Sequence, residues 1–287
     1  MIDLHCHLLP GLDDGAPNLA TALTMARQAV EQGVTHVACT PHILPGVYHN
    51  RGPGIRNATR SLQDALDHEG IPLQLVTGAD VHMAPNFVAG LKSGELLTLA
   101  DSRYVLVEPP HNVAPPRLEQ FFFNLMTAGY VPVLTHPERL SWILSRYEII
   151  KKLVQSGVWI QVTAGSFTGA FGRTTLYWAV QLLDEGCVHL IASDAHDAER
   201  RPPNLAAGCD AVAKRIGAQE AEHLVFTRPM GILKDQPPSS LPGPFRGAGA
   251  DGESVEIPES SGGRLDLGRP TARGVRGFSD RLRRLFR

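Results

Sequence analysis

The alternation of short apolar runs with amphipathic segments is the feature that most constrains the fold of this chain. The apolar runs are rich in Val, Ile and Leu and mostly lack a polar–apolar alternation, which is typical of strands covered on both faces. They predict strands at Ile2–His5, His36–Thr40, Leu73–Thr77, Tyr104–Glu108, Val131–Thr135, Trp159–Thr163 and His189–Ser193. Apolar residues at helical spacing predict helices between them, at Leu19–Gln32, Ile55–His68, Arg117–Ala128, Tyr147–Gln155, Thr174–Asp184 and Ala206–Ile216.

Strand–helix units that follow one another indicate a parallel α/β sheet. At this chain length the simplest arrangement is a distorted, seven-stranded (β/α) barrel of the TIM type over residues 1–234. An open, doubly wound sheet is the alternative, although no GxGxxG or Walker loop supports a nucleotide-binding version of it. Residues 235–277 are rich in Pro, Gly and Ser, so we expect a disordered linker there.

The last segment, 278–287, has a different composition. Phe278, Leu282, Leu285 and Phe286 recur on one face of a short helix, and the stretch from residue 264 to the end holds eight Arg and two Asp. Such a basic amphipathic segment indicates peripheral contact with an anionic inner-membrane surface, contact with an acidic protein surface, or a tail that only aids solubility.

The chain shows the signs of a cytoplasmic protein. Its four cysteines are scattered without a CxxC pair, which favours reduced thiols. No secretory signal follows Met1, and no apolar run approaches the ~20 residues needed to cross a bilayer. We therefore expect a soluble, cytoplasmic protein, with membrane contact only through the segment 278–287.

Imidazoles and carboxylates follow the ends of six of the seven predicted strands or lie in the turn after the first. Because these ends converge on one face of a barrel, we expect the side chains to meet there. One such residue alone is usually a turn residue or a cap, but many carboxylates in one cleft repel each other and require cations. The sequence therefore predicts a centre of two or three metal ions. The candidate ligands are His5, His7, His42, Asp80, Glu108, His136, Asp194 and His196, together with Asp13 or Asp14 from the turn after the first strand.

The ligand types and two arginines narrow the chemistry. Mixed imidazole and carboxylate ligands without thiolates favour Mn, Fe or Zn. Such centres bind a phosphate oxygen and lower the pKa of a bridging water. Arg139 and Arg201 follow the fifth and last strands, and guanidinium groups match phosphate oxygens. Cys6 alternates with His5 and His7, so it should point away from them into the core.

These motifs resemble the PHP (polymerase and histidinol phosphatase) superfamily over residues 1 to about 230. The string Leu8-Leu9-Pro10-Gly11-Leu12-Asp13-Asp14-Gly15 after the paired histidines, together with His136-Pro137-Glu138-Arg139 and Ser193-Asp194-Ala195-His196, is similar to manganese-dependent tyrosine phosphatases of bacterial capsule and exopolysaccharide systems. The resemblance implies a distorted barrel, attack of a metal-activated hydroxide on phosphotyrosine, and an autophosphorylating tyrosine kinase as substrate.

The resemblance also implies a role for each residue. His5, His7, Asp80 and Asp194 would hold a first ion, Asp80, Glu108 and His136 a second, and Asp14, His42 and His196 a third. Arg139 and Arg201 would grip phosphate, and with His42 they form the implied catalytic set. The chain departs from the family at two positions, with Asp80 where Glu is usual and His82 where Arg is frequent.

Four other readings remain open. The chain could hydrolyse a small phosphomonoester such as histidinol phosphate, it could be a nuclease, or it could be a metal-stabilised regulatory domain without catalysis. A net charge of -2 and the lack of a basic stripe disfavour the nuclease. A thiol mechanism is suggested by the C-x5-R spacing of Cys209 and Arg215, but that stretch has no internal Gly and predicts a helix.

Overall fold

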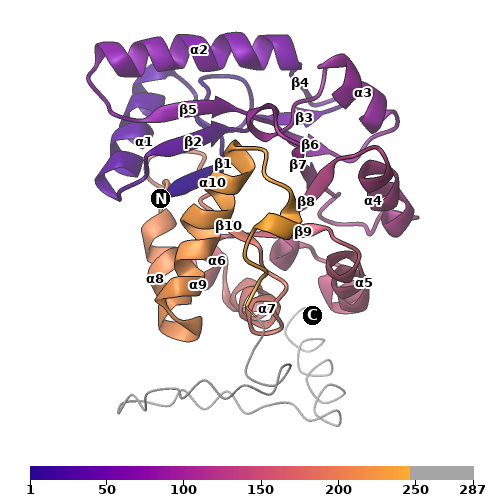
Figure 1. The fold of residues 1–287 in the computed structure, drawn as a ribbon. Helices are drawn as coiled ribbons and strands as arrows, with labels where there is room; N and C mark the ends of the chain where they lie inside the picture. The colour runs from indigo at the N-terminus through magenta and orange to yellow at the C-terminus, as the bar shows by residue number, and fades with distance from the viewer. Residues whose placement is uncertain (246–287) are drawn as a thin grey trace, which may run out of the picture. The chain divides into compact units, whose positions relative to one another are not determined.

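The computed structural model describes residues 1–245, in which the strands lie at the centre and the helices surround them (Figure 1). The strands are β1 (Ile2–Cys6), β2 (His36–Cys39), β3 (His42–Leu44), β4 (Tyr48–His49), β5 (Gln74–Thr77), β6 (Asp80–His82), β7 (Tyr104–Glu108), β8 (Val131–Thr135), β9 (Trp159–Thr163) and β10 (Leu190–Ala192). The helices are α1 (Leu19–Glu31), α2 (Gly52–His68), α3 (Phe87–Ser93), α4 (Leu118–Thr127), α5 (Ile143–Gln155), α6 (Ala164–Phe167), α7 (Arg173–Asp184), α8 (Leu205–Ile216), α9 (Ala218–Glu222) and α10 (Arg228–Leu233).

The strands of the described region close into a ring. One sheet has the order β1-β2-β5 and the other β10-β9-β8-β7-β6-β3-β4, with parallel pairing except between β3 and β4. β2 runs on into β3 and β5 into β6, which joins the two sheets on one side. On the other side the Asp194 N–H donates to the His5 carbonyl at 2.8 Å and the His7 N–H donates to the Ala195 carbonyl at 2.9 Å. The barrel therefore has seven strand positions, and two of them are filled by the broken strands β2–β3 and β5–β6. The alternative of an open, doubly wound sheet is thereby excluded.

The two broken strands aim side chains at one end of the barrel. Pro41 interrupts the first of them because it has no N–H to donate. Gly78 interrupts the second where space is short, since a Cβ there would lie 3.0 Å from side-chain carbons of both Leu99 and Thr40. After the breaks β3 pairs with β6. These three-residue strands were missed in the sequence because their apolar runs are too short.

Apolar side chains form two clusters within residues 1–245. The inner cluster is drawn largely from the strands themselves and consists of Ile2, Leu4, Ala38, Leu99, Tyr104, Leu106, Val131, Val133, Trp159, Leu190 and Ile232. The outer cluster joins the other face of the strands to the helices and includes Cys6, Val107, Phe122, Leu134 and Leu182. Strands with apolar residues on both faces explain the continuous apolar runs of the sequence.

A β-bulge in β1 re-aims the two paired histidines. The pairing of β1 with β2 shifts register in the second half of the strand. Leu4 belongs to the inner cluster, and His5 points the same way, because its ring contacts Gln161, which lies two residues after Trp159 of that cluster. An unbroken strand would place adjacent residues on opposite faces, so the extra residue of the bulge is needed. Cys6 faces the outer cluster, as predicted.

The predicted helices match α1, α2, α4, α5, α7 and α8 to within a few residues. No helix within residues 1–245 is long and apolar enough to cross a bilayer.

The packed region extends past the expected boundary at residue 234. The Arg103 N–H donates to Asp235 at 2.8 Å, the Tyr104 hydroxyl donates to the Gln236 carbonyl at 2.8 Å, and Leu241 packs on the inner cluster. The rest of the predicted linker and the amphipathic segment lie outside the described residues.

Candidate metal centre

The strand ends bring all nine predicted ligands to one end of the barrel. His5 and His7 come from β1 and the turn after it, His42 from β3, Asp80 from β6 and Glu108 from β7. The turn after β8 supplies His136, and the turn after β10 supplies Asp194 and His196. Asp14 comes from the turn after β1. Among these side chains only Asp14 is exposed, with 51 % of its surface accessible.

His5 and His7 direct the same ring nitrogen toward a common point. The Nδ1 atom of His5 lies 2.9 Å from the Gln161 Oε1 atom, and the Nδ1 atom of His7 lies 2.7 Å from the Asp13 Oδ2 atom. Their Nε2 atoms lie 3.2 Å apart. Because each Nδ1 has a partner, Nε2 is the nitrogen of both rings that is available to a metal ion.

Asp194 divides its two oxygens between the histidines and the arginines. Its Oδ1 atom lies 3.5 Å from the His5 Nε2 atom and 3.4 Å from the His7 Nε2 atom. Its Oδ2 atom accepts a hydrogen bond from Arg201 at 2.7 Å and another from Arg139. One oxygen is therefore directed at the ligand cluster while two guanidinium groups hold the other.

Glu108 lies among four imidazoles. Its Oε2 atom contacts His82 and lies 3.2 Å from the His42 Nδ1 atom. Its Oε1 atom accepts a hydrogen bond from the His111 Nε2 atom at 2.9 Å and lies 3.6 Å from the His136 Nε2 atom. The His82 and His111 rings were not among the predicted ligands.

A third group of donors surrounds Asp14. Its Oδ1 atom lies 3.6 Å from the Nε2 atoms of both His42 and His196. The His196 ring lies beside the His7 ring at a tilt of 36°, with 3.9 Å between ring centroids. The turn after β1 therefore closes the cluster on its solvent side.

The carboxylates and imidazoles shift one another's pKa values. Burial lowers the pKa of His7, but the Asp13 carboxylate outweighs it and the pKa rises to about 9. Burial also opposes protonation of His42. The carboxylates of Asp80 and Glu108 favour protonation more strongly, so the pKa of His42 rises to about 11. Burial raises the pKa of Asp80, and the neighbouring charge of Glu108 raises it further. The carboxylates therefore favour protons on His7, His42 and Asp80, because the protein alone does not balance the negative charges of the cluster.

Two other imidazoles stay neutral. Burial and the charge of Arg139 hold the pKa of His136 well below its usual range. Burial and the charge of His7 lower the pKa of His196 to about 2. A neutral imidazole is the form that binds a metal ion, so both rings are in the ligating state at neutral pH.

The donor atoms fit metal ions better than they fit one another. The His42 Nδ1, Asp80 Oδ1, Asp80 Oδ2, Glu108 Oε2 and His136 Nδ1 atoms are buried and have no hydrogen-bond partner within residues 1–245. Buried polar atoms without partners are costly, and a cation would satisfy them. Donor atoms within 4.8 Å of one another form four groups: His7, Asp14, His42 and His196; His5, His7 and Asp80; His42, His82 and Glu108; Glu108, His111 and His136.

Arg139 and Arg201 share one aromatic neighbour. The guanidinium carbon of Arg139 lies 4.7 Å from the centroid of the Phe171 ring, and that of Arg201 lies 5.8 Å from it. Both distances are within the range of cation–π attraction. Phe171, in the turn between α6 and α7, therefore supports both arginines from the same side.

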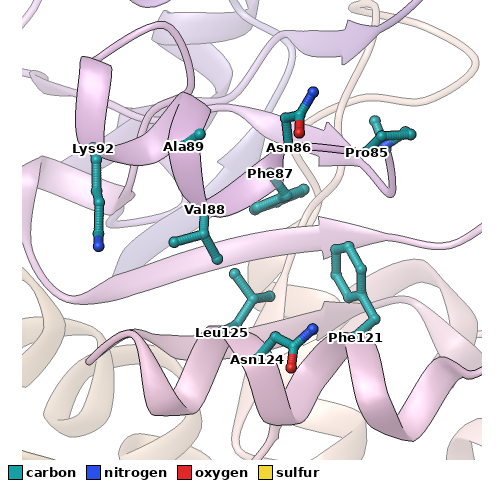
Figure 2. A pocket seen from close by; sticks show the side chains of 10 residues that line it. Pro85, Asn86, Phe87, Val88, Ala89, Lys92, Phe121, Asn124 and Leu125 are labelled. Carbon is teal, nitrogen blue, oxygen red and sulfur yellow. The ribbon is translucent and has the colours of Figure 1, made fainter.

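Two cavities lie around the start of α3. The larger, of about 550 Å³, lies between α3 and α4, and Figure 2 shows Phe87, Val88 and Phe121 among the side chains that line it. The smaller, of about 420 Å³, is lined by His82 and by Pro85. The His82 ring, which contacts Glu108, therefore also borders this cavity.

Five residues that contact the ligands or the arginines were assigned no role from the sequence, although a sequence pattern pointed to some of them. The sixth strand appeared to lack a site residue, but it supplies Gln161, whose amide in a buried strand was the signal. Asp13 directly precedes the predicted ligand Asp14, and His82 lies two positions after the predicted ligand Asp80. His111 and Phe171 lie in turns without a recognisable pattern, so only the fold reveals them.

Comparison with known proteins agrees with this geometry. The family model described as capsular polysaccharide synthesis, CpsB/CapC, matches residues 1–234. The tyrosine-protein phosphatase YwqE of Bacillus subtilis (strain 168) is 36% identical over 219 residues, which is 76% of this chain and 86% of that protein. The tyrosine-protein phosphatase CpsB of Streptococcus pneumoniae is 26% identical over 241 residues, covering 82% and 99%.

Solved structures give the same picture. A crystal structure from work on YwqE of Bacillus subtilis and CpsB of Streptococcus pneumoniae, described as unique metal-dependent tyrosine phosphatases, superposes with a TM-score of 0.79. The two chains are 34% identical, and the match covers 83% of this chain and 96% of the other. A β-aspartyl dipeptidase of Fervidobacterium islandicum AW-1 matches with a TM-score of 0.51 at 14% identity, over 82% and 75% of the two chains, which shows a shared fold alone.

Proposed function

This chain belongs to the CpsB/CapC family of capsular polysaccharide synthesis proteins, and on that premise we propose that it is a metal-dependent tyrosine-protein phosphatase. The family resemblance stated from the sequence is thereby confirmed. One observation carries the function. The Asp194 carboxylate joins the cluster of imidazoles and carboxylates to two arginines, Arg139 and Arg201.

We propose that three ions are held at the strand ends. His5, His7, Asp80 and Asp194 surround the first position, Asp80, Glu108 and His136 the second, and Asp14, His42 and His196 the third. Mn²⁺ is the ion we propose, since the donors are nitrogen and oxygen without sulfur, and Fe or Zn would also suit them. When bound, the ions lower the pKa of a water molecule and offset charge on the phosphoryl oxygens.

The protein's own groups bind and orient the phosphate. Arg139 and Arg201 offer N–H groups beside the cluster, held by Asp194 and by the Phe171 ring. Guanidinium groups in such a position grip the phosphoryl oxygens and stabilise the charge that grows on them during displacement. His42, between the Asp14 and Glu108 carboxylates, completes the proposed catalytic set.

We also propose the partner and the location. The family is one of capsular polysaccharide synthesis. A tyrosine phosphatase in such a system requires a tyrosine-phosphorylated protein, and we propose an autophosphorylating kinase for that role. We place the barrel in the cytoplasm because its four cysteines are unpaired. Residues 278–287 would bring it to an anionic membrane surface.

The tail proposal has a simple test. Full-length protein and a variant truncated after Gly277 are mixed with anionic liposomes at low salt and sedimented. We expect only the full-length protein to sediment and both to hydrolyse soluble phosphopeptide equally. Equal sedimentation of the two would contradict membrane contact through this segment.

The function itself is tested by metal depletion and substrate comparison. The protein is stripped with a chelator, and Mn²⁺, Fe²⁺ or Zn²⁺ is added back before assays on a phosphotyrosine peptide, histidinol phosphate and single-stranded DNA. We expect activity on the peptide that depends on added metal and is highest with Mn²⁺. Faster hydrolysis of histidinol phosphate, cleavage of DNA, or no hydrolysis of any substrate would replace the proposal with one of its alternatives.

A further inference from the structure

Three short motifs at the strand ends share one pattern. Each consists of an imidazole or carboxylate, a buried small or apolar residue, and then a histidine: His5-Cys6-His7, Asp80-Val81-His82 and Asp194-Ala195-His196. The middle residues Cys6, Val81 and Ala195 are at most 1 % exposed. Residues at i and i+2 of an extended chain lie on the same face, so each motif presents two donors together. In two of the motifs both donors have a proposed ligand role, and in the third only Asp80 has one.

The sheet register places His82 where a ligand is needed. Asp80 pairs with His42 on one side of β6, and His82 pairs with Glu108 of β7 on the other. Paired residues of parallel strands share a face, so His82 and Glu108 point to the same side. The His82 Nε2 atom contacts the Glu108 Oε2 atom, and the His42 Nδ1 atom lies 3.2 Å from that oxygen and 3.3 Å from the Asp80 Oδ2 atom.

A simple ion pair does not account for this arrangement. The Glu108 Oε2, Asp80 Oδ2 and His42 Nδ1 atoms are all buried without a hydrogen-bond partner within residues 1–245. Asp80 is fully buried and Glu108 is 4 % exposed, so water does not substitute readily for the missing partners. Oxygen and nitrogen atoms that converge without hydrogen-bond geometry are typical of ligands around a shared cation.

We propose that His82 is a metal ligand, and that its Nε2 atom joins the His42 Nδ1 atom and the Glu108 carboxylate in holding a divalent cation of the Mn²⁺ class. This inference rests on the proposed function, because it adds a donor to the centre of that enzyme. His82 also lines the 420 Å³ cavity beside α3.

Metal binding tests the proposal without reference to turnover. Metal-free full-length protein is titrated with Mn²⁺ by calorimetry, and the ions retained after gel filtration are counted by mass spectrometry. We expect His82→Ala to bind one of the Mn²⁺ equivalents at least about tenfold more weakly. His49→Ala, which removes an exposed imidazole from the edge strand β4, should bind as the wild type does.

A second variant keeps the test decisive. His82→Asp restores a hard donor at the same position, so it should recover part of the Mn²⁺ affinity lost in His82→Ala. Thermal unfolding of the metal-free variants checks that each is folded. Wild-type number and affinity of ions in His82→Ala would overturn the proposal, as would failure of His82→Asp to recover any affinity. Neither result would affect the phosphatase function, which fails only if the metal-loaded wild type does not hydrolyse phosphotyrosine.

Discussion

His7 and Asp13 are joined by a 2.7 Å hydrogen bond from the ring Nδ1 atom to a carboxylate oxygen. The same oxygen accepts the His42 backbone N–H at 2.9 Å, and the other oxygen accepts the Gly15 N–H at 2.9 Å. Asp13 therefore fixes one proposed ligand, the start of β3 and the turn after β1 at once. It orients the ring of His7 rather than competing with it for a metal ion.

Asp13→Asn should weaken metal binding without unfolding the barrel. The amide keeps the shape of the side chain but loses the charge that holds the His7 ring, so we expect Mn²⁺ affinity to fall by about 10- to 100-fold. Calorimetric titration measures this. Asp64→Asn on the exposed face of α2 is the control, and equal affinities of the two variants would contradict an orienting role.

His136→Ala and Arg139→Ala should separate metal binding from phosphate binding. The first removes a proposed ligand and should lower turnover of phosphotyrosine peptide by at least about 100-fold, together with the metal content. The second should raise KM and lower kcat at unchanged metal content. Elemental analysis of both purified variants decides, and loss of metal from Arg139→Ala would assign that residue to the structure of the centre.

Cys209→Ser should leave phosphatase activity unchanged. Cys209 and Arg215 lie within α8, where Arg215 pairs with Asp184, so the C-x5-R stretch is helical as predicted and forms no phosphate loop. Burial raises the pKa of the Cys209 thiol, which makes it a poor nucleophile at neutral pH. Assays before and after iodoacetamide treatment check this, and inactivation of the metal-loaded enzyme that Cys209→Ser prevents would support a thiol mechanism.

Phe171→Leu should weaken phosphate binding. The variant keeps apolar volume but removes the ring below both guanidinium groups, at a cost of about 1 kcal/mol, or roughly fivefold in KM. Phe171→Tyr keeps the ring and should behave as the wild type does. Phe123→Leu, at an exposed position of α4, controls for general effects. If Phe171→Tyr loses as much affinity as Phe171→Leu, the cation–π account is wrong.

His189→Phe should flatten the dependence of stability on pH. Burial and the charge of Arg228 lower the pKa of His189 to about 3, and its Nδ1 atom accepts the Ile160 N–H at 3.1 Å. The unfolded chain, with a pKa near 6.5, binds this proton more readily. Stability from the neutral ring is therefore complete above pH ~6.5 and is lost as the pH falls toward 3, by up to about 1.4 kcal/mol per pH unit.

Urea unfolding between pH 4.5 and 7, with a chelator present, measures that slope in the wild type and in His189→Phe. Phenylalanine keeps the stacking of the ring on Trp159, whose centroid lies 5.0 Å away. Parallel curves for the two proteins would show that His189 does not titrate on unfolding.

Continuous buried strands were predictable from the sequence, whereas interrupted ones were not. The bounds of β7, β8 and β9 coincide with their apolar runs because both faces of these strands are covered. The pieces β3 and β6 are set by a proline, a crowded glycine and pairing across the sheet, which no local pattern records. Helix lengths followed from periodicity. The short α3, which follows Asn86 in a left-handed conformation, has too few residues to show a periodicity.

The site divides in the same way. Ligands at strand ends were predictable because a parallel barrel must bring those ends together. The partners of the ligands were not, since Gln161 and His111 contact the site only through tertiary packing. The bulge in β1 is also invisible locally, although it decides which way His5 points.

The hydrogen bonds that close the barrel between His5 and Asp194 join segments at opposite ends of the domain, with a sequence separation of 189 residues for the neighbouring pair Cys6 and Ala195. At translation rates of ~5–20 residues per second, the first strand leaves the ribosome about 10 to 40 seconds before its partner. Until then β1 has an open edge, and His5 and His7 lack the carboxylate of Asp194. The nascent chain thus carries an unfinished, aggregation-prone edge for most of its synthesis.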